Sequence, residues 1–336
     1  MAANRQKRKG PRALTRRRMI AISAASMAMA LPGMALAQTR QVTWRGVALG
    51  AEAKIQLVHS DEALARTVLD QCVREIDRLE DLFSLYRPAS AVNALNRSGT
   101  LPNPDMAFLE LVAAALQISR ETDGAFDISV QPLWQLYADH FATPGTNPAG
   151  PAPELVDHVL GLVDYRKIKV SPQRIALGQP GMSVTLNGIA QGFITDRIAA
   201  LLNRNGFSRV LVHLGESYGA GTRADGSPWR AGIAAPDGSG SLVKTVGLSN
   251  RALATSGGYG HKFDSSGKHH HLFDPHNGLS ASRFGSVSVA GPSAMRADAL
   301  STAFSVLPLE HIREIIDRHA DTSGLIVAYD GKLIEI

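Results

Sequence analysis

The sequence predicts an α+β protein, with mixed or antiparallel sheets and helices that flank them. Strand-like and helical segments are interleaved along the chain, and short turns at 236–238 and 330–331 join strand-like segments into hairpins. Hairpins of this kind favour α+β over a doubly wound parallel sheet. The 336 residues are 44% hydrophobic and 19% charged. That composition suits one large globular domain or two intertwined subdomains with a proper core.

The first 37 residues predict a bacterial export signal. Arg16, Arg17 and Arg18 precede an apolar run that breaks at Pro32-Gly33, and residues 35–37 give an Ala-x-Ala cleavage site. Paired arginines ahead of such a run are typical of the twin-arginine route, so we expect a folded protein in the periplasm, cleaved near Ala37. The alternative is an uncleaved anchor, but the run is shorter than the roughly 20 residues of a spanning helix.

The charge of the remaining chain, residues 38–336, gives no indication of nucleic-acid binding. Eight of the 35 Lys and Arg residues lie in the first 37 residues, which hold no acid. The rest therefore carries 27 basic against 30 acidic residues, a net charge of −3. Cys72 is the single cysteine, so an intrachain disulfide is impossible, and its place in an apolar stripe predicts a core residue.

The first half of this domain predicts two paired strands followed by helices. Residues 43–58 alternate around Gly50, and a long helix opens at Asp61. A short helical turn over 90–96 and a helix over 105–121 follow, and Gly124 can take the left-handed cap. The Pro- and Gly-rich residues 143–153 predict a loop. The apolar stripe of the long helix consists of Leu64, Val68, Cys72, Ile76, Leu79 and Phe83.

Residues 181–202 predict a strand, a glycine turn and a helix. Met182, Val184 and Leu186 alternate as in a half-buried strand, and helical spacing begins after Asn187-Gly188. Gly188 and Gly192 allow another group to approach the backbone closely, and the first helical turn favours an anion such as a pyrophosphate. Tight packing alone is the simpler interpretation of these glycines.

The second half predicts more strands than helices. We expect a buried strand over 209–214, a hairpin of 229–235 with 243–248, and a strand over 285–290. Helices are expected over 294–306 and 310–319, and a closing hairpin pairs 324–329 with 332–336.

Asp298 and Thr302 are the first candidate for chemistry. They lie four residues apart in a predicted helix, so both oxygens project from one face. A carboxylate and a hydroxyl suit Mg²⁺, which completes its shell with phosphate oxygens and water. The alternative is that Thr302 bonds back to a helix carbonyl and Asp298 is a surface charge.

Two further candidates have simpler explanations. His269, His270 and His271 cannot all face one metal in a strand, and a solvated loop with one functional histidine fits them better than a zinc site. Asp127 follows Gly124 and has the position of a cap for the next turn.

Seven motifs in order resemble the ApbE family, the bacterial FAD:protein FMN transferases. The resemblance covers roughly residues 43–330. The motifs are SLYRPASAVNALN (84–96), TDGAFDIS (122–129), TLNGIAQG (185–192), LVHLGE (211–216), ATSGGY (254–259), HLFDPHNG (271–278) and ADALSTAF (297–304).

The resemblance implies an ApbE-like fold and a site for Mg²⁺ and FAD. It places Mg²⁺ on Asp298, Thr302 and the backbone carbonyl of Gly188. It makes His271 the candidate catalytic residue, as a proton acceptor or a group that orients a phosphate. The FAD contacts that it implies are Leu49, Tyr86, Ala125, Phe126, Asp127, Thr185, Gln191 and Phe273.

The activity that the resemblance implies is Mg²⁺-dependent transfer of FMN from FAD to a Thr or Ser hydroxyl of a partner protein, with release of AMP. The export signal and the NGIAQG variant are most similar to the NosX-type branch. That branch implies an acceptor of the NosR kind, a membrane flavoprotein that supports nitrous oxide reduction.

The chain departs from the commoner family pattern in four places. Thr185 occupies a position where an Asp is usual, and Gln191 one where a Lys or an acid is usual. Glu216-Ser217 replaces the usual Gly-Asp or Gly-Asn, and residues 49–51 replace Met-Gly-Thr. A non-catalytic FAD-binding or maturation protein is therefore a second hypothesis, and a binding protein for an unrelated solute is a third. No Ser-Gly-Ala-Thr acceptor motif occurs in the chain, which argues against self-flavinylation.

Overall fold

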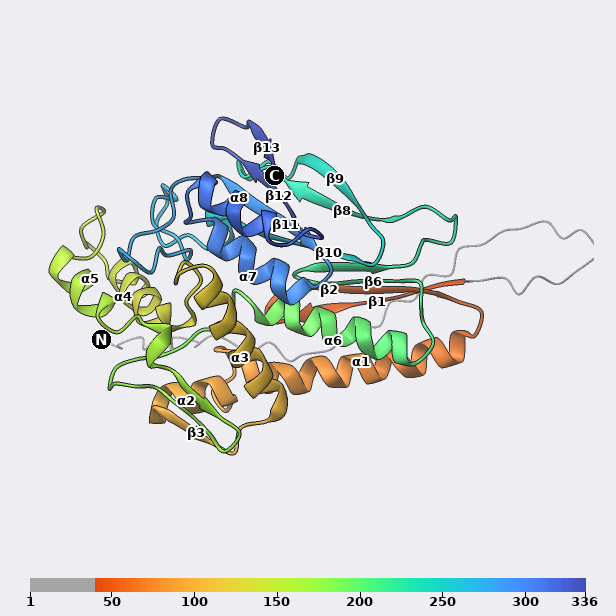
Figure 1. Cartoon of the computed structure of the whole chain (residues 1–336), viewed down its shortest axis with the longest axis horizontal. Coiled ribbons are helices and arrows are strands. Elements are labelled where there is room, and N and C mark those ends of the chain that lie inside the picture. Colours follow the sequence, from red (N-terminus) through yellow and green to blue (C-terminus); the bar gives the residue numbers. More distant parts are fainter. Residues whose placement is uncertain (1–39) are drawn as a thin grey trace, which may run out of the picture.

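The computed structural model describes residues 40–336. The predicted export signal lies outside them. An eight-stranded sheet dominates the fold (Figure 1), and every neighbouring pair in it is antiparallel. This arrangement confirms the α+β class. The strands, in spatial order, are β1 (Arg40–Ala48), β2 (Ala51–His59), β6 (Val210–Leu214), β7 (Ser217–Ala220), β10 (Arg251–Ser256), β11 (Ser286–Gly291), β12 (Ser323–Val327) and β13 (Leu333–Glu335).

Both faces of the central part of this sheet are buried. Successive side chains in a strand point to opposite faces, so Val212 in β6 joins the main core while Leu211 joins a second cluster. The second cluster is closed by the hairpin of β8 (Trp229–Ala234) and β9 (Leu242–Leu248), which was predicted. Leu253 in β10 and Leu325 in β12 reach this hairpin from the sheet. The central strands β6 and β11 are accordingly buried along nearly their whole length, whereas β1 and β13 at the edges keep exposed residues.

The main core lies between the sheet and a layer of helices. α1 (Glu62–Phe83), α6 (Ala190–Arg204) and α7 (Ala294–Phe304) pack against β1, β6 and β10, respectively, and α8 (Leu309–Asp317) joins the same core (Figure 1). None of the helices in residues 40–336 is long and apolar enough to span a membrane.

The apolar stripe predicted for α1 is buried except at its first position. Asp61 caps the helix by accepting a hydrogen bond from the Leu64 N–H at 2.9 Å. Leu64 itself is 41% exposed, whereas Ala65 is fully buried. Positions 64 and 65 both adjoin Val68 on a helix, and the smaller side chain is the one that faces the sheet.

The remaining elements flank this core. α2 (Ala91–Ser98) and α3 (Met106–Glu121) match the predicted helices, and Gly124, which follows the end of α3, has φ +81°. A small sheet joins β3 (Thr100–Pro102), β5 (Arg174–Ala176) and β4 (Lys169–Ser171). The predicted loop separates α4 (Gln131–Ala142), which the sequence analysis did not identify, from α5 (Pro153–Leu160). Short 3-10 turns occupy η1 (Ile128–Val130), η2 (Tyr165–Lys167) and η3 (Gly258–Gly260).

The strand predicted over residues 182–186 is wrong. Met182, Val184 and Leu186 are buried in alternation, but the segment pairs with no strand. The side chain of Asn96 takes the place of a neighbouring strand, because it accepts from the Val184 N–H at 2.7 Å and donates to the Val184 carbonyl at 2.9 Å. Alternating burial does not by itself distinguish a paired strand from an extended segment held by a side chain.

Cys72 is confirmed as a core residue. It is fully buried in α1, and burial raises the pKa of its thiol to about 12. A thiol that is both protonated and enclosed is a poor nucleophile.

We predict that Cys72 does not react with a disulfide reagent such as DTNB at pH 8 while the protein is folded. The same reagent should titrate one thiol per chain after unfolding in guanidinium chloride, which serves as the control. Rapid reaction of the native protein would contradict the burial of this side chain.

Candidate active site

A cavity of about 290 Å³ opens between the helix layer and the loops at one end of the large sheet. It is lined by every residue that the sequence analysis proposed for the site, although these residues are spread from position 49 to position 302. The structure brings these twelve together: Leu49, Tyr86, Ala125, Phe126, Asp127, Thr185, Gly188, Gln191, His271, Phe273, Asp298 and Thr302.

The crossing of α6 over α7 forms the floor of this cavity. An ideal Cβ on Gly192 would lie 2.3 Å from the carbonyl oxygen of Ala294 and 2.7 Å from Cα of Met295. Only glycine leaves room for the two backbones at this distance. The Gly192 N–H donates to Oδ2 of Asp298 at 3.0 Å. The anion at this helix N-terminus is therefore a carboxylate of the protein itself.

Asp196, one turn further along α6, joins the two helices a second time. Its carboxylate accepts from the Ser293 hydroxyl at 2.7 Å and from the N–H groups of Ala294 and Met295 at 2.8 and 3.0 Å. These backbone donors belong to the first turn of α7, so Asp196 satisfies helix-end groups that would otherwise lack partners. Together with the contact at Gly192, this cap sets the position of the helix that carries Asp298 and Thr302.

Three oxygen donors meet above the crossing. Asp298 is 4% exposed, which rules out the alternative of a surface charge. The Thr302 hydroxyl lies 3.3 Å from the Ser256 hydroxyl, and it would be 3.0 Å from a Cβ on Gly188. The Gly188 turn, Asp298 and Thr302 thus share one corner of the cavity, as predicted.

Glu216 adds a second buried carboxylate to this corner. It is 8% exposed and accepts from the Thr255 N–H at 3.2 Å. Burial raises the pKa of Asp298 to about 7, and burial together with the negative charge of Asp298 raises the pKa of Glu216 well above its usual range. No Lys or Arg of the described residues lines the cavity. The corner is therefore rich in oxygen and short of positive charge.

Asp127 is satisfied by the protein in the way that its capping interpretation predicted. One oxygen accepts from the N–H and hydroxyl of Ser129 at 2.7 and 2.6 Å, and the other accepts from the Tyr165 N–H at 2.9 Å. Asp127 is 8% exposed, and burial raises the pKa of its carboxyl. Its carboxylate holds η2 against the cavity wall.

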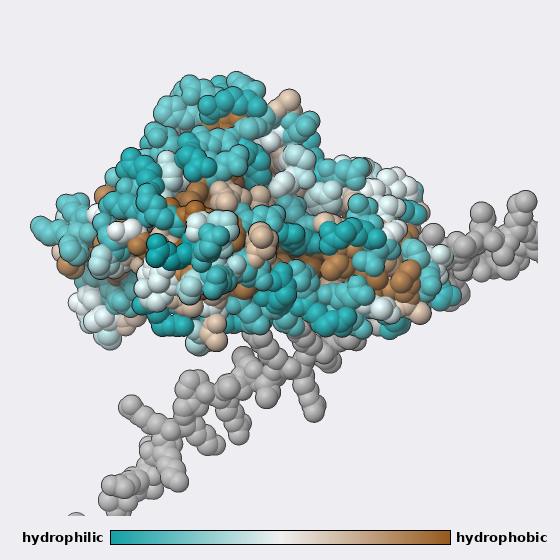
Figure 2. Space-filling view, turned by 60° about the horizontal axis from the view of Figure 1, so that its bottom comes forward, coloured by the Kyte–Doolittle hydropathy of each residue, from teal (hydrophilic) through white to brown (hydrophobic). Residues whose placement is uncertain are grey.

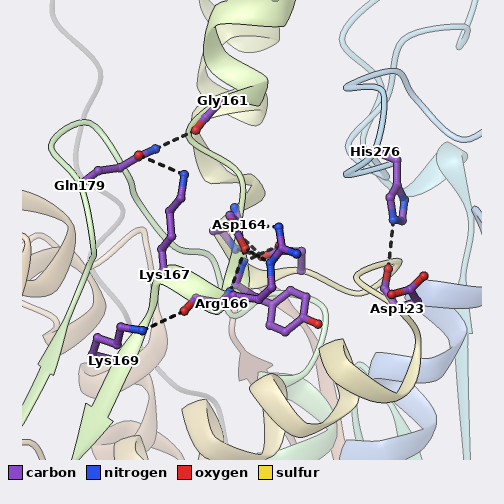
Figure 3. A network of polar contacts seen from close by, with 11 residues as sticks. Asp123, Gly161, Asp164, Arg166, Lys167, Lys169, Gln179 and His276 are labelled. Atoms are coloured by element: carbon purple, nitrogen blue, oxygen red, sulfur yellow. Dashed lines mark hydrogen bonds and ion pairs between the residues drawn. The ribbon is translucent and has the colours of Figure 1, made fainter.

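The segment from η2 to β4 and the loop after Phe273 carry a polar network beside this wall (Figure 3). Gln179 receives a hydrogen bond from Lys167 Nζ at 3.1 Å and donates to the Gly161 carbonyl at 2.7 Å. The imidazole of His276 donates to the Asp123 carbonyl at 3.0 Å. This bond ties the loop that follows Phe273 to the turn that precedes Ala125 and Phe126.

The turn between β1 and β2 places Leu49 on the opposite wall. Leu49 has φ +46°, which is unusual for a residue with a side chain. Its N–H donates to Oε1 of Glu80 at 2.8 Å, and Glu80 in turn pairs with Arg87. Tyr86, beside Arg87, lies at the mouth and is 71% exposed. The buried Glu80 therefore holds the strained turn next to the segment of Tyr86.

The three consecutive histidines face three different partners. His269 packs against the rings of Tyr137 and Phe141. Nε2 of His270 forms a hydrogen bond of 2.8 Å with the Ala281 carbonyl. Since a carbonyl only accepts, His270 is the donor. Both are less than 10% exposed, so the prediction of a solvated loop is wrong for them. Aromatic residues of α4 cover His269, and His270 packs beside Gly258 and bonds Ala281.

His271 is the histidine that reaches the cavity. Its Nδ1–H donates to the His261 carbonyl at 3.2 Å, which leaves Nε2 as an acceptor. Burial lowers the pKa of His271 to about 4, so the ring is neutral at pH 7. A neutral imidazole with a fixed tautomer is able to accept a proton.

Thr185 and Gln191 mark the positions where the chain departs from the commoner family pattern. Thr185 bonds locally, because its hydroxyl accepts from the Asn187 N–H at 3.2 Å. Gln191 packs over Gly215, where an ideal Cβ would be 2.5 Å from its amide carbon. Both lie next to the cavity corner without adding charge to it.

Sequence reasoning left several residues of the cavity lining out of the site, among them Glu216, Ser256 and Trp134. Glu216 appeared only as a departure from the family pattern, although its place directly after a buried strand and Gly215 was a usable signal. Ser256 stood in a motif without a role. Trp134 lies on α4, which was not predicted as a helix.

We predict that Gly192→Ala lowers the free energy of unfolding by roughly 1–3 kcal/mol, even though alanine is favoured over glycine in a helix by about 1 kcal/mol. The new methyl group would collide with backbone atoms of α7, which cannot rotate away. Urea denaturation measures the change. Gly247→Ala is the control, since its nearest neighbour would be at 3.5 Å; equal stability of both variants would contradict the close crossing.

The chain was compared with known families and proteins. The ApbE family profile matches residues 49–326. The FAD:protein FMN transferase of Salmonella typhimurium is 30% identical over 286 residues, 81% of this chain and 80% of that protein. The one from Escherichia coli K12 is 29% identical over 291 residues, 83% of this chain and 82% of that protein.

Solved structures agree with these sequence matches. The apo form of the Pseudomonas stutzeri flavinyl transferase ApbE superposes with a TM-score of 0.76 at 28% identity, over 90% of this chain and 96% of that one. The ApbE protein of Thermotoga maritima gives 0.74 at 26% identity, over 88% and 96%. Since the matched residues include every segment that lines the cavity, the chain belongs to the ApbE family.

Proposed function

We propose that this protein transfers FMN from FAD to a Ser or Thr hydroxyl of an acceptor protein and releases AMP. The observation that carries the proposal is the single cavity in which an oxygen-rich corner adjoins an apolar, aromatic wall. A pyrophosphate accompanied by a divalent cation suits the first, and a flavin or adenine ring suits the second. The relatives named as FAD:protein FMN transferases match over four fifths of the chain, which supports this activity.

The donors of the oxygen-rich corner fit Mg²⁺. Asp298, Thr302 and the Gly188 carbonyl are hard oxygen ligands, and two buried carboxylates there lack a positive partner. The described residues hold no group of three or more His, Cys, Asp or Glu side chains suited to a metal. The donor set therefore suits an ion that completes its shell with substrate oxygens and water. When bound, the ion would neutralise charge on the pyrophosphate.

The other proposed contacts position FAD. Leu49 and Tyr86 lie on one wall, and Ala125, Phe126 and Phe273 offer apolar surface on the other. Phe273 is held by a ring contact with Tyr137, with the centroids 5.0 Å apart. Thr185 and Gln191 flank the corner and can hydrogen-bond without charge. Asp127 acts through the backbone it holds, because both of its oxygens already have protein donors.

The reaction forms one bond and breaks one. The acceptor oxygen attacks the phosphorus on the FMN side of the pyrophosphate, and the bond from that phosphorus to the bridging oxygen breaks. The bridging oxygen leaves with AMP. Nε2 of His271 accepts the proton of the attacking hydroxyl, for which the neutral tautomer described above is suited. Holding the two substrates in line supplies much of the rate, as in other phosphoryl transfers.

The setting of the reaction forms part of the proposal. The arginines and the Ala-x-Ala site of residues 1–37 support export by the twin-arginine route to the periplasm, with residues 38–336 as the transferase domain. A NosX-type role, with a NosR-like membrane flavoprotein as acceptor, rests on the same signal and on the NGIAQG motif.

The proposal is tested by incubating the chain from Gln38 onward with FAD, Mg²⁺ and an acceptor domain that carries a Ser-Gly-Ala-Thr motif. Mass spectrometry should show the acceptor heavier by one FMN, and AMP should appear in equal amount. Asp298→Ala should reduce the rate by about 10²–10³-fold or more, the effect of removing one transition-state stabilising group. FAD binding without any change of acceptor mass would favour the non-catalytic carrier.

We predict that His271→Gln lowers kcat by roughly 10²–10⁴-fold, the usual contribution of a general base. FAD affinity should change little, because the proposed role begins with the acceptor hydroxyl. Single-turnover transfer and FAD titration measure the two quantities. His276→Gln is the control, since its ring bonds a carbonyl next to the cavity but does not line it. An equal loss in both variants would contradict the assignment of His271.

A further inference from the structure

We propose that Glu216 is a second carboxylate ligand of the divalent cation, so that this chain holds the ion between Glu216 and Asp298. The inference rests on the cation site of the proposed function. It concerns a residue that stands where the commoner family pattern has glycine, and it makes the site of this chain more acidic.

The position of Glu216 is set by its backbone. It follows Gly215, with φ +97°, in the tight turn between β6 and β7, where His213 pairs with Ser217. The Leu214 N–H donates to the Glu216 carbonyl at 3.0 Å, which closes the turn. Gln191 packs on Gly215 and presses this turn against the start of α6. The Glu216 side chain consequently lies in the cavity corner rather than in solvent.

Each of the two carboxylates has one oxygen to spare. Oε2 of Glu216 accepts from the Thr255 N–H, and Oδ2 of Asp298 accepts from the Gly192 N–H. The hydrogen bonds of these two side chains with residues 40–336 use Oε2 of Glu216 and Oδ2 of Asp298, so Oε1 of Glu216 and Oδ1 of Asp298 are left for another ligand. Both side chains are more than nine-tenths buried. Two uncompensated carboxylates in such a place are costly unless a cation lies between them.

Nothing else in the cavity supplies the positive charge. Among the described residues, the lining contains no Lys or Arg, and His271 is neutral at pH 7. The third carboxylate, Asp127, differs because its two oxygens accept three hydrogen bonds from Ser129 and Tyr165. Charge compensation is thus required at Glu216 and Asp298 and not at Asp127.

The end of β10 contacts both Glu216 and Thr302. The Thr255 N–H binds Glu216, and the next residue, Ser256, contacts the Thr302 hydroxyl at 3.3 Å and the Ser301 hydroxyl at 2.7 Å. The end of β10 therefore fixes Glu216 relative to the oxygen donors on α7. The resulting set of two carboxylates, a hydroxyl and a carbonyl is the kind of site that Mg²⁺ and Mn²⁺ prefer.

The test is Mn²⁺ binding, measured without FAD by electron paramagnetic resonance of the free ion. Glu216→Gln keeps the size of the side chain and an oxygen for the Thr255 N–H but removes the charge. We expect its Kd for Mn²⁺ to rise by roughly 10- to 100-fold, the loss found when groups around a metal are removed. Asp298→Asn is the positive control and should weaken binding at least as much.

Asp127→Asn is the matched control, because it removes one negative charge from the same cavity without removing a free oxygen. Its Kd for Mn²⁺ should stay close to that of the unmodified protein. If Asp127→Asn weakened Mn²⁺ binding as much as Glu216→Gln, removal of any negative charge from the cavity would explain the loss. The inference that Glu216 is a ligand would then be overturned. An unchanged Kd in Glu216→Gln would also overturn it.

A second measurement separates ligation from misfolding. Without divalent ions, Glu216→Gln should melt no lower than the unmodified protein, since it removes a buried carboxyl whose ionisation is costly. On addition of Mg²⁺ the unmodified protein should gain more in melting temperature than the variant. A variant that melts lower than the unmodified protein in both conditions would point to a structural role instead.

The inference and the proposed function can fail separately. If FMN transfer takes place but Glu216→Gln binds Mn²⁺ normally, only the inference fails. If Glu216→Gln loses Mn²⁺ affinity while no acceptor ever gains FMN, the cation site stands and the transferase proposal fails.

Discussion

The close contact between α6 and α7 is the constraint on which the rest of the site depends. The two backbones meet at Gly192, and Asp196 caps α7 from the side of α6. One helix brings the Gly188 turn and the other brings Asp298 and Thr302, so their relative position decides whether the three oxygen donors share a corner. Because both contacts involve backbone atoms, side-chain rearrangement cannot absorb a change there. The sheet below them supplies a rigid support through β6, β10 and β11.

The electrostatics of the cavity follow from this packing. The Gly192 N–H and the Thr255 N–H each bind one carboxylate oxygen, but they do not neutralise two buried acids. A doubly negative pyrophosphate would meet the same corner, so the divalent cation that we propose would compensate the charge of both the protein and the substrate. The departures at Gln191 and Glu216 both lie beside this corner, since this chain has a neutral residue where a Lys or an acid is usual and an acid where a glycine is usual. Because of Glu216, the cation site that we propose for this chain is more acidic than one that follows the commoner family pattern.

The outer walls of the cavity are built differently. Leu49, Tyr86, Ala125, Phe126 and Phe273 come from turns and segment ends, and each is held by a side chain that does not itself line the cavity or by a local cap. Glu80 holds the strained turn of Leu49, Asp127 holds η2, and His276 ties the loop after Phe273 to the end of α3. The face of the molecule shown in Figure 2 is mostly hydrophilic, with hydrophobic residues confined to limited areas. Such an arrangement leaves the mouth open to an acceptor protein while the floor stays fixed.

Local pattern determined the class of fold, the hairpins, the stripe of α1 and the helix carrying Asp298 and Thr302, because strand alternation and helical spacing express which face of each element is buried. The family resemblance also implied twelve site residues, and all of them line one cavity. Only the tertiary structure decided which extended segment pairs as a strand. Residues 182–186 have the alternation but bond to Asn96, which is 88 positions from Val184. It also decided that His269 and His270 are buried, that Leu64 is not, and that Glu216 joins Asp298. Each of these outcomes depends on contacts between residues far apart in the chain, and no periodicity within one segment contains that information.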